Sequence, residues 1–217
     1  MATPQHFTTQ RTARYYTIGA SVSETKHFWF ACHGFAQLAG EFINEFEPLV
    51  ALGGRIVAPE ALNRFYTRGF DGRVAATWMT RDDRDAEIQD YVAYLDGLFA
   101  HETATLGAGA NKHILGFSQG ATTVCRWVAM RQPSFNHLWL CSGDLPHDLD
   151  WQVFKKAMEG KMLHLVLGNA DPLLPEGRKE ATLAKIEEHG VIHKLHEFEG
   201  AHELNLATLL GEIEGNK

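Results

Sequence analysis

The sequence predicts an α/β protein whose sheet is mostly parallel and covered by helices on both faces. Short apolar segments of strand length alternate along the chain with longer segments whose apolar residues recur at helical spacing. Such alternation is typical of parallel strands joined by crossover helices. No internal repeat or change of composition divides the 217 residues, so we expect a single domain over residues 1–217.

Seven apolar segments are predicted as strands. Segment 26–32, KHFWFAC, is apolar at almost every position, as expected for a central strand that is buried on both faces. Segment 12–20 is expected at the edge of the sheet. The remaining strands are expected over residues 55–58, 113–117, 137–141, 162–168 and 191–198.

Six segments show the period of a helix. The clearest covers residues 84–100, and Asp82 or Asp83 is placed to cap its first turn. One face of this segment carries Ile88, Tyr91, Val92, Leu95, Leu98 and Phe99. The other helices are expected over residues 38–50, 121–129, 151–158, 177–189 and 203–213.

Segment 60–83 has no regular period and is longer than an ordinary connector. Loops of this length often form lids or binding surfaces, so we expect a substrate loop or lid here. Its large apolar side chains either form a wall for an acyl chain or pack the loop onto the body. They are Phe65, Tyr66, Phe70, Trp78 and Met79. Its basic residues, which either attract an anionic substrate or form a solvated face, are Arg64, Arg68, Arg73 and Arg81.

Composition argues against several classes of protein. The net charge of −7 and the lack of a basic block argue against nucleic acid as the main partner. No apolar run approaches the roughly 20 residues that span a bilayer, and no secretory signal is visible. Cys32, Cys125 and Cys141 lie in apolar patterns and are interpreted as buried thiols in a reducing compartment. We therefore expect a cytoplasmic protein without stable membrane insertion.

The most informative motif is Gly-x-Ser-x-Gly at residues 116–120. An apolar strand precedes it and a helical pattern follows it. At a strand-to-helix turn this motif is the nucleophile elbow of an α/β-hydrolase, and elsewhere it is a chance match. Gly116 and Gly120 lack the Cβ atoms that would clash where strand and helix cross. We therefore predict the α/β-hydrolase fold, with Ser118 as the nucleophile.

A serine hydroxyl needs a histidine to accept its proton and a carboxylate to orient that histidine. In α/β-hydrolases the chain order is Ser, then Asp or Glu, then His, and each residue follows a strand end. Asp171 follows the strand expected over 162–168, and His202 follows the last strand. These two residues are predicted as the acid and the base, while Asp144, after the strand 137–141, remains an alternative acid.

Twelve histidines make other arrangements worth weighing. Those inside strands, including His113 and His164, are interpreted as surface or hydrogen-bonded residues. Four late histidines resemble a metal cluster by count, but Gly190 interrupts them and no helical pair forms, so no metal site is expected. They are His189, His193, His196 and His202.

The oxyanion of an acyl transfer needs two N–H donors. One is expected to be the backbone N–H of Gln119, directly after the nucleophile. The other is expected from Phe35, in the loop after the first central strand, because Gly34 lets the backbone approach closely. The alternative is that His33-Gly34-Phe35 is a plain turn at the end of a strand.

Four segments together resemble the phospholipase/carboxylesterase family, which includes acyl-protein thioesterases. They are HGF at 33–35, GFSQG at 116–120, NADPLLP at 169–175 and GAHE at 200–203. The resemblance covers about residues 26–210 and implies the same triad and oxyanion donors. Ala121 replaces a glycine that is usual in the family, and segment 58–66 also departs from its pattern. The second departure weakens any transfer of substrate identity.

These residues predict a serine hydrolase that cleaves a small-molecule ester or thioester through an acyl-enzyme. The expected acyl-pocket residues are Phe65, Tyr66, Trp78 and Met79. No cofactor is needed, and either a monomer or a homodimer is expected. The alternatives are a catalytically silent α/β-hydrolase that acts as a binding protein, and an acyltransferase or peptidase on the same triad.

Overall fold

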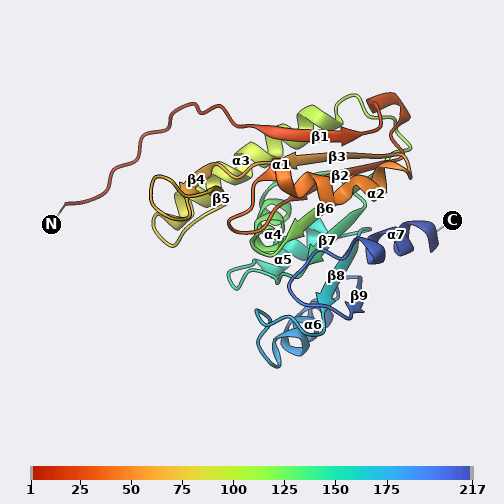
Figure 1. The fold of residues 1–217 in the computed structure, drawn as a ribbon. Coiled ribbons are helices and arrows are strands. Elements are labelled where there is room, and N and C mark those ends of the chain that lie inside the picture. Colours follow the sequence, from red (N-terminus) through yellow and green to blue (C-terminus); the bar gives the residue numbers. More distant parts are fainter. Residues whose placement is uncertain (1, 216–217) are drawn as a thin grey trace.

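A computed structural model, which describes residues 2–215, confirms the predicted α/β fold (Figure 1). Seven strands form one sheet in the order β1-β3-β2-β6-β7-β8-β9. The edge strand β1 is antiparallel to β3, and all other neighbours are parallel. The strands are β1 (Tyr15–Gly19), β2 (His27–Cys32), β3 (Gly54–Pro59), β6 (Asn111–Phe117), β7 (His137–Cys141), β8 (Met162–Gly168) and β9 (His193–Phe198).

Helices cover both faces of this sheet, as predicted. The carboxyl ends of the parallel strands meet at one edge, where the loops carrying the predicted site residues lie. One face packs against α3 (Arg84–Thr103), α4 (Gln119–Arg131), α5 (Trp151–Ala157) and α6 (Arg178–Glu188). The other packs against α1 (Ala39–Phe42), α2 (Glu47–Val50) and α7 (Leu206–Gly215). The short 3₁₀ helices are η1 (Val22–Glu24) and η2 (Ile43–Phe46).

Two local expectations about helices are wrong. The helix expected over 38–50 is three short pieces, α1, η2 and α2, and Pro48 in α2 has no N–H with which to continue a regular ladder. The expected aspartate cap of α3 does not form. Asp83 has a left-handed backbone with φ of 49°, and its side chain makes no capping hydrogen bond. Its carboxylate instead accepts a hydrogen bond from His6 Nε2 at 2.9 Å.

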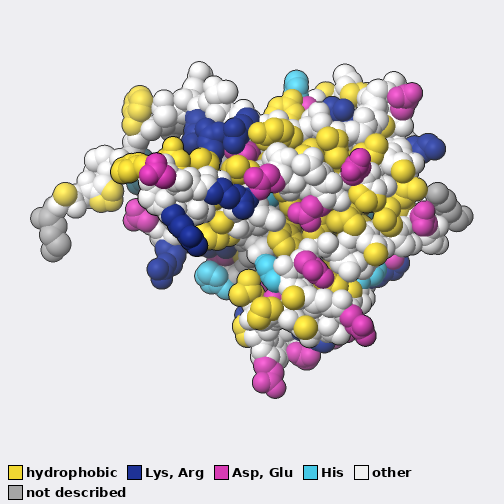
Figure 2. Space-filling view, in the orientation of Figure 1, with side chains coloured by type: hydrophobic (Ala, Val, Ile, Leu, Met, Phe, Trp, Pro, Cys, Tyr) yellow, Lys and Arg dark blue, Asp and Glu magenta, His cyan; other side chains and the backbone are white. Residues whose placement is uncertain are grey.

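Segment 60–83 contains a β-hairpin that the sequence pattern did not predict. Strands β4 (Asn63–Tyr66) and β5 (Val74–Thr77) pair antiparallel and form a second, two-stranded sheet. Figure 2 shows lysine and arginine side chains gathered over this part of the molecule. Two of the arginines are ion-paired, Arg64 with Glu60 and Arg73 with Glu41. These pairs fit a solvated face better than an anion site, and the role of the segment as a lid stays a prediction.

Five histidines from five neighbouring strands form a connected row across the sheet, which we call the histidine array. It consists of His27, His113, His137, His164 and His196. Ring nitrogens lie 3.2 Å apart between His27 and His113, 3.0 Å between His137 and His164, and 3.1 Å between His164 and His196. Two buried tryptophans stack on it, Trp29 on His113 and Trp139 on His164.

The array lies on the sheet face that α7 covers. A cavity of about 380 Å³ adjoins it and is also lined by Lys194 and Glu212, which form an ion pair between β9 and α7. The hydrogen-bonded histidines expected inside strands are therefore confirmed, but as one row rather than as separate residues.

The three cysteines are buried and free, as predicted. Burial raises the pKa of each thiol above its usual value, so the thiols of Cys32, Cys125 and Cys141 stay protonated. Among residues 2–215, no helix is both long enough and apolar enough to cross a membrane. A cytoplasmic location stays a prediction.

Candidate active site

The predicted elbow lies at the turn from β6 to α4. Ser118 there has φ of 53° and ψ of −116°, a conformation that side chains rarely adopt. Its N–H donates to the carbonyl of Cys141 on the neighbouring strand at 3.0 Å. A Cβ added at Gly116 would lie 2.3 Å from the carbonyl oxygen of Gly120, and one at Gly120 would lie 2.2 Å from that of Cys32. Both glycines are therefore needed for strand and helix to cross this closely.

His202 and Asp171 meet Ser118 in one hydrogen-bonded row. His202 Nε2 lies 2.8 Å from Ser118 Oγ, and His202 Nδ1 lies 2.8 Å from Asp171 Oδ2. Asp171 follows β8 and His202 follows β9, so neighbouring strand ends deliver both loops to the same place. A Cβ at Gly168 would lie 2.3 Å from the carbonyl oxygen of Ala201, so glycine at this strand end allows the loops to touch.

The hydrogen bonds fix the roles of the ring nitrogens of His202. The side chain of Asp171 is only 3% exposed, and its other oxygen, Oδ1, accepts from the N–H of Leu173 at 2.8 Å. An ionised carboxylate can only accept, so His202 Nδ1 carries the proton and donates it to Asp171. Nε2 of the neutral ring is then an acceptor, which is the state that can take a proton from the Ser118 hydroxyl.

The loop after β2 lies against Ser118. A Cβ at Gly34 would lie 3.2 Å from Ser118 Cβ, so this backbone approaches the nucleophile closely. Ala36 N–H donates to Ala76 O at 2.9 Å, and Gly34 N–H donates to Gln37 Oε1 at 2.7 Å. Within residues 2–215, the N–H groups of Phe35 and Gln119 have no protein acceptor. Both donors predicted for the oxyanion are therefore unused by the fold.

Side chains hold the loop after β2 and the first turn of α4, which carry the two N–H donors, in place. His33 Nε2 accepts from the N–H of Ala61 at 3.1 Å, so its Nδ1 carries the proton and donates to Gly34 O at 2.8 Å. Burial lowers the pKa of His33, which keeps this ring neutral. The side chain of Gln119 donates to Thr77 Oγ1 at 2.9 Å and to Met79 O at 3.0 Å. These bonds tie the first turn of α4 to the segment after β5.

The family follows from comparison of the sequence. A family model described as serine hydrolase (FSH1) matches residues 49–204, which is well over half of the chain. The chain is a serine hydrolase of the FSH1 family. No curated protein matches it significantly.

Solved structures confirm the fold of this serine hydrolase. The esterase PE8 has 19% identity and a TM-score of 0.71, over 94% of this chain and 99% of that one. The acyl-protein thioesterase 2 of Zea mays has 16% identity and a TM-score of 0.69, also over 94% and 99%. The phospholipase/carboxylesterase of Dyadobacter fermentans has 19% identity and a TM-score of 0.67, over 97% and 99%. The expected likeness to small serine esterases of α/β-hydrolase fold is confirmed.

Asp144, the alternative acid, is engaged elsewhere in this serine hydrolase. Its Oδ1 accepts from Thr182 Oγ1 and from the N–H of Leu145, each at 2.7 Å, and its Oδ2 pairs with Arg178 Nε. No bond joins it to His202 in the described part of the chain. The geometry therefore favours Asp171 over Asp144 as the partner of His202.

Ser142 is a supporting residue that the sequence did not reveal. It is buried at the end of β7 with φ of 43°, and its hydroxyl donates to the carbonyl of Glu203 at 2.8 Å. Since Glu203 follows His202 directly, this bond anchors the histidine loop to the neighbouring strand. No sequence signal marks such a contact, because 61 residues separate the two partners.

A cavity of about 210 Å³ opens beside Ser118 and His202. It lies on the side of the loops that follow β7 and β8, away from segment 60–83. Its apolar lining is Leu167, Leu173, Leu174 and Pro175, and its other polar lining includes Ser142, Asp144, Asp171 and Arg178.

The side chains predicted for the acyl pocket do not line this cavity. Trp78 is 1% exposed, and its indole N–H donates to the carbonyl of His33 at 2.8 Å, so it belongs to the core. Phe65 stacks on Phe35 with ring centroids 5.6 Å apart, and Tyr66 is exposed on the hairpin. Met79 packs partly buried against the core and contacts Arg126 through its sulfur. The alternative that these residues pack the loop onto the body therefore describes Trp78 and Met79.

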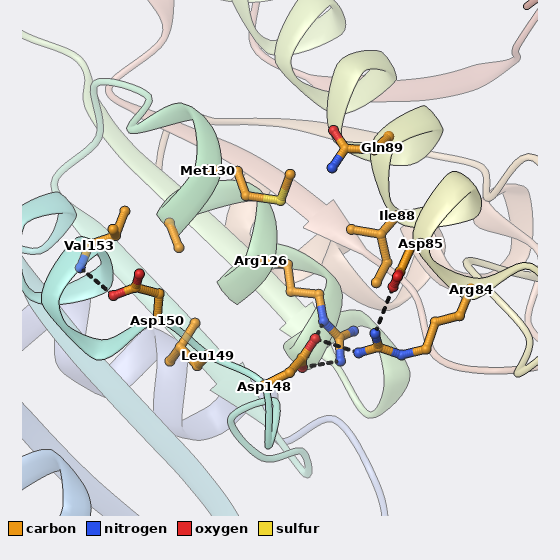
Figure 3. A pocket seen from close by; sticks show the side chains of 11 residues that line it. Arg84, Asp85, Ile88, Gln89, Arg126, Met130, Asp148, Leu149, Asp150 and Val153 are labelled. Atoms are coloured by element: carbon orange, nitrogen blue, oxygen red, sulfur yellow. Dashed lines mark hydrogen bonds and ion pairs between the residues drawn. The ribbon is translucent and has the colours of Figure 1, made fainter.

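A larger cavity, of about 440 Å³, contains none of the triad residues. It lies between α3, α4 and the start of α5 (Figure 3). Arg84 and Arg126 both pair with Asp148 at its edge. Burial alone would raise the pKa of Asp148, but the hydrogen bonds from the two arginines hold it well below its usual value. Because both arginines already pair with this carboxylate, we assign no catalytic or binding role to the larger cavity.

The four late histidines are not gathered into a metal site. His189 stacks on Trp151, His193 Nδ1 donates to the carbonyl of Val191, and His196 belongs to the histidine array. Only His202 faces the nucleophile. No group of three or more metal-binding side chains was found in the part of the chain that the structure describes.

Proposed function

We propose that this serine hydrolase cleaves carboxylic esters of small molecules through an acyl-enzyme formed on Ser118. The observation that carries the proposal is the unbroken row of two 2.8 Å hydrogen bonds from Ser118 through His202 to Asp171. A thioester follows the same chemistry and is a second possible substrate class.

In the first half-reaction, Ser118 Oγ attacks the carbonyl carbon while His202 Nε2 accepts the hydroxyl proton. Asp171 remains ionised and stabilises the imidazolium that forms. Negative charge develops on the former carbonyl oxygen, and the N–H groups of Phe35 and Gln119 are placed to receive it. His202 then protonates the leaving alcohol or thiol as the tetrahedral intermediate collapses to the acyl-enzyme.

In the second half-reaction, water replaces the departed alcohol. His202 accepts a proton from this water, the hydroxide attacks the acyl carbon, and the same donors stabilise the second oxyanion. Ser118 Oγ leaves and recovers its proton from His202. The residues of the chain supply every proton transfer in this scheme.

The test is steady-state hydrolysis of p-nitrophenyl esters, from acetyl to palmitoyl, and of matched acyl-thioesters by wild type and by Ser118→Ala. Removing the nucleophile of a working triad should lower kcat by about 10³-fold or more. Ser134→Ala is the control, because Ser134 is exposed and lies beyond the opposite end of α4 from the elbow. A fluorophosphonate probe should label wild type and Ser134→Ala but leave Ser118→Ala unlabelled.

Each alternative has its own outcome. Lack of turnover and of labelling in wild type would favour a silent binding protein and contradict the proposal. Ester products formed only when a second alcohol is added would indicate an acyltransferase. Equal turnover by wild type and Ser118→Ala would exclude Ser118 as the nucleophile.

A further inference from the structure

The cavity beside Ser118 is small for a hydrolase site. At about 210 Å³ it lies below the roughly 300–1,000 Å³ that is usual for sites binding drug-sized ligands. The apolar residues Leu167, Leu173, Leu174 and Pro175 supply a surface for hydrocarbon. Besides the triad residues and Ser142, the lining contains one ion pair, between Asp144 after β7 and Arg178 at the start of α6. The pair therefore bounds a space that is otherwise suited to an acyl chain.

Asp144 is the firmly held partner of the ion pair between Asp144 and Arg178. Asp144 receives three hydrogen bonds, from Arg178 Nε, from Thr182 Oγ1 and from the N–H of Leu145. The side chain of Asp144 is 23% exposed and that of Arg178 is 45% exposed. Both acceptor oxygens of Asp144 are occupied, so the carboxylate holds the guanidinium of Arg178 in the lining of the cavity. Arginine does not lose its charge at any ordinary pH, so a charged group is always present at this place in the lining.

A hydrocarbon chain that reached this pair would have to remove water from it. Covering a charged or polar group without replacing its hydrogen bonds costs free energy, whereas covering the leucines releases it. Chain length should therefore help binding only until the acyl group meets the pair. Beyond that length each added methylene should bring no gain or a loss.

We propose that Asp144 and Arg178 determine acyl-chain specificity by ending the acyl pocket, so that short acyl groups, acetyl to about hexanoyl, are the preferred substrates. The inference rests on the proposed function of the same site. Arg178 sets the limit by its position, and Asp144 acts through Arg178 as a positioning residue.

The experiment compares kcat/KM for a series of p-nitrophenyl esters from acetyl to dodecanoyl in wild type, Arg178→Ala and Asp144→Asn. Wild type should be fastest on short chains. In Arg178→Ala the ratio of octanoyl to acetyl kcat/KM should rise by about tenfold or more, within the range that hydrophobic pockets give for added methylenes. Asp144→Asn keeps the shape of the side chain and should shift the ratio in the same direction but less.

Lys179→Ala provides the matched control. Lys179 is the next residue of α6 and is also ion-paired, with Glu197, but it does not line the cavity. Its chain-length profile should equal that of wild type. A second series with one acyl group and alcohols of increasing length tests which part of the ester enters the cavity.

Three results would overturn the inference. The first is a wild-type kcat/KM that is highest for the dodecanoyl ester. The second is an octanoyl-to-acetyl ratio of kcat/KM that is unchanged in both Arg178→Ala and Asp144→Asn. The third is a change of kcat/KM in the variants that appears only when the length of the alcohol is varied. Wild type that hydrolyses acetyl ester with an unchanged profile in the variants rejects only this inference. Wild type that hydrolyses none of the esters rejects the proposed function, and the inference with it.

Discussion

The histidine beyond the end of a strand and the histidines within the strands have different hydrogen-bond partners. His202, beyond the end of β9, joins a serine to a carboxylate, and its ring therefore has one acceptor side and one donor side of different chemistry. The rings of the histidine array lie inside the strands and bond mainly to one another. Burial lowers the pKa of His164 to about 3 and that of His113 well below its usual value, so these two rings are neutral. Partners, rather than residue type, decide whether a histidine is placed to exchange protons or only to hold the structure together.

The bonds of His113 show why this ring must stay neutral. An indole N–H can only donate, and Trp139 Nε1 donates to His113 Nδ1 at 3.2 Å. His113 Nδ1 is therefore unprotonated, and its Nε2–H donates to His27 Nδ1. A second proton on His113 would place an N–H against the N–H of Trp139. His202 has no such conflict, since its Nε2 faces a hydroxyl that can reverse its role.

The largest effect that tests this comparison should come from Asp171→Asn. The amide keeps the shape of the carboxylate but can donate a hydrogen bond, so it permits the wrong tautomer of His202 and no longer stabilises the imidazolium. In a serine protease the same change costs about 10⁴-fold in kcat, and we expect a loss of about 10³- to 10⁴-fold here. The measurement is kcat for p-nitrophenyl acetate, with thermal unfolding to verify the fold. A loss below tenfold would mean that Asp171 does not orient His202.

Acid should act on the two sets of histidines in different ways. A second proton on His202, at Nε2, should stop ester hydrolysis without unfolding, because the partner of this nitrogen is the hydroxyl of Ser118 and not a group that holds the core together. As the pH falls, four rings of the array should lower the free energy of unfolding, because their pKa values are depressed in the folded state and the unfolded chain takes up protons first. These rings belong to His113, His137, His164 and His196. The stability that these neutral rings contribute should be fully present above about pH 6.5. It should decline as the pH falls toward about 3, by roughly 1.4 kcal/mol per pH unit for each proton that the unfolded chain takes up.

Urea unfolding followed by tryptophan fluorescence at pH 7, 6, 5 and 4 measures this decline. His164→Gln removes one titrating ring and should make the dependence on pH shallower than in wild type. His6→Gln is the control, because His6 is exposed and lies outside the array. An unfolding free energy that stays constant from pH 6.5 to pH 4 would contradict the neutral array.

The smallest effect is expected from Ser142→Ala. Loss of its hydrogen bond to Glu203 O should cost about 1 kcal/mol of stability and lower kcat a few-fold, because the loop of His202 is held less firmly. Thermal unfolding and kcat for p-nitrophenyl acetate measure both effects, and Ser134→Ala again serves as the exposed control. An unchanged kcat would show that this anchor stabilises the fold without positioning the histidine.

The positions of the triad residues could be predicted from the sequence, but the positions of the side chains around them could not. The meeting of Ser118, Asp171 and His202 could be predicted because each follows a strand with a clear apolar pattern, and strand ends meet at one edge of a parallel sheet. The role of Trp78 could not be decided, because an aromatic residue in an irregular loop gives the same sequence pattern whether it faces a substrate or packs in the core. Its burial depends on the contact with His33, 45 residues away.

The histidine array was hidden for a related reason. Each of its histidines was visible in a strand, but their row depends on the register between strands, such as the pairing of His113 with His137. Register follows from packing on both faces of the whole sheet, which a single strand pattern does not contain. The same limit applies to Ser142 and to the pairing of Asp144 with Arg178.

The backbone at Ser118 has a consequence for how this chain can change over time. A φ of 53° costs a residue with a Cβ of the order of 1–3 kcal/mol, and glycine avoids that cost. If Ser118 is the nucleophile, as proposed, the more stable glycine variant at this position is an inactive one. Selection for stability and selection for catalysis would then oppose each other at residue 118, and a lineage released from the need for catalysis would be expected to lose Ser118 early.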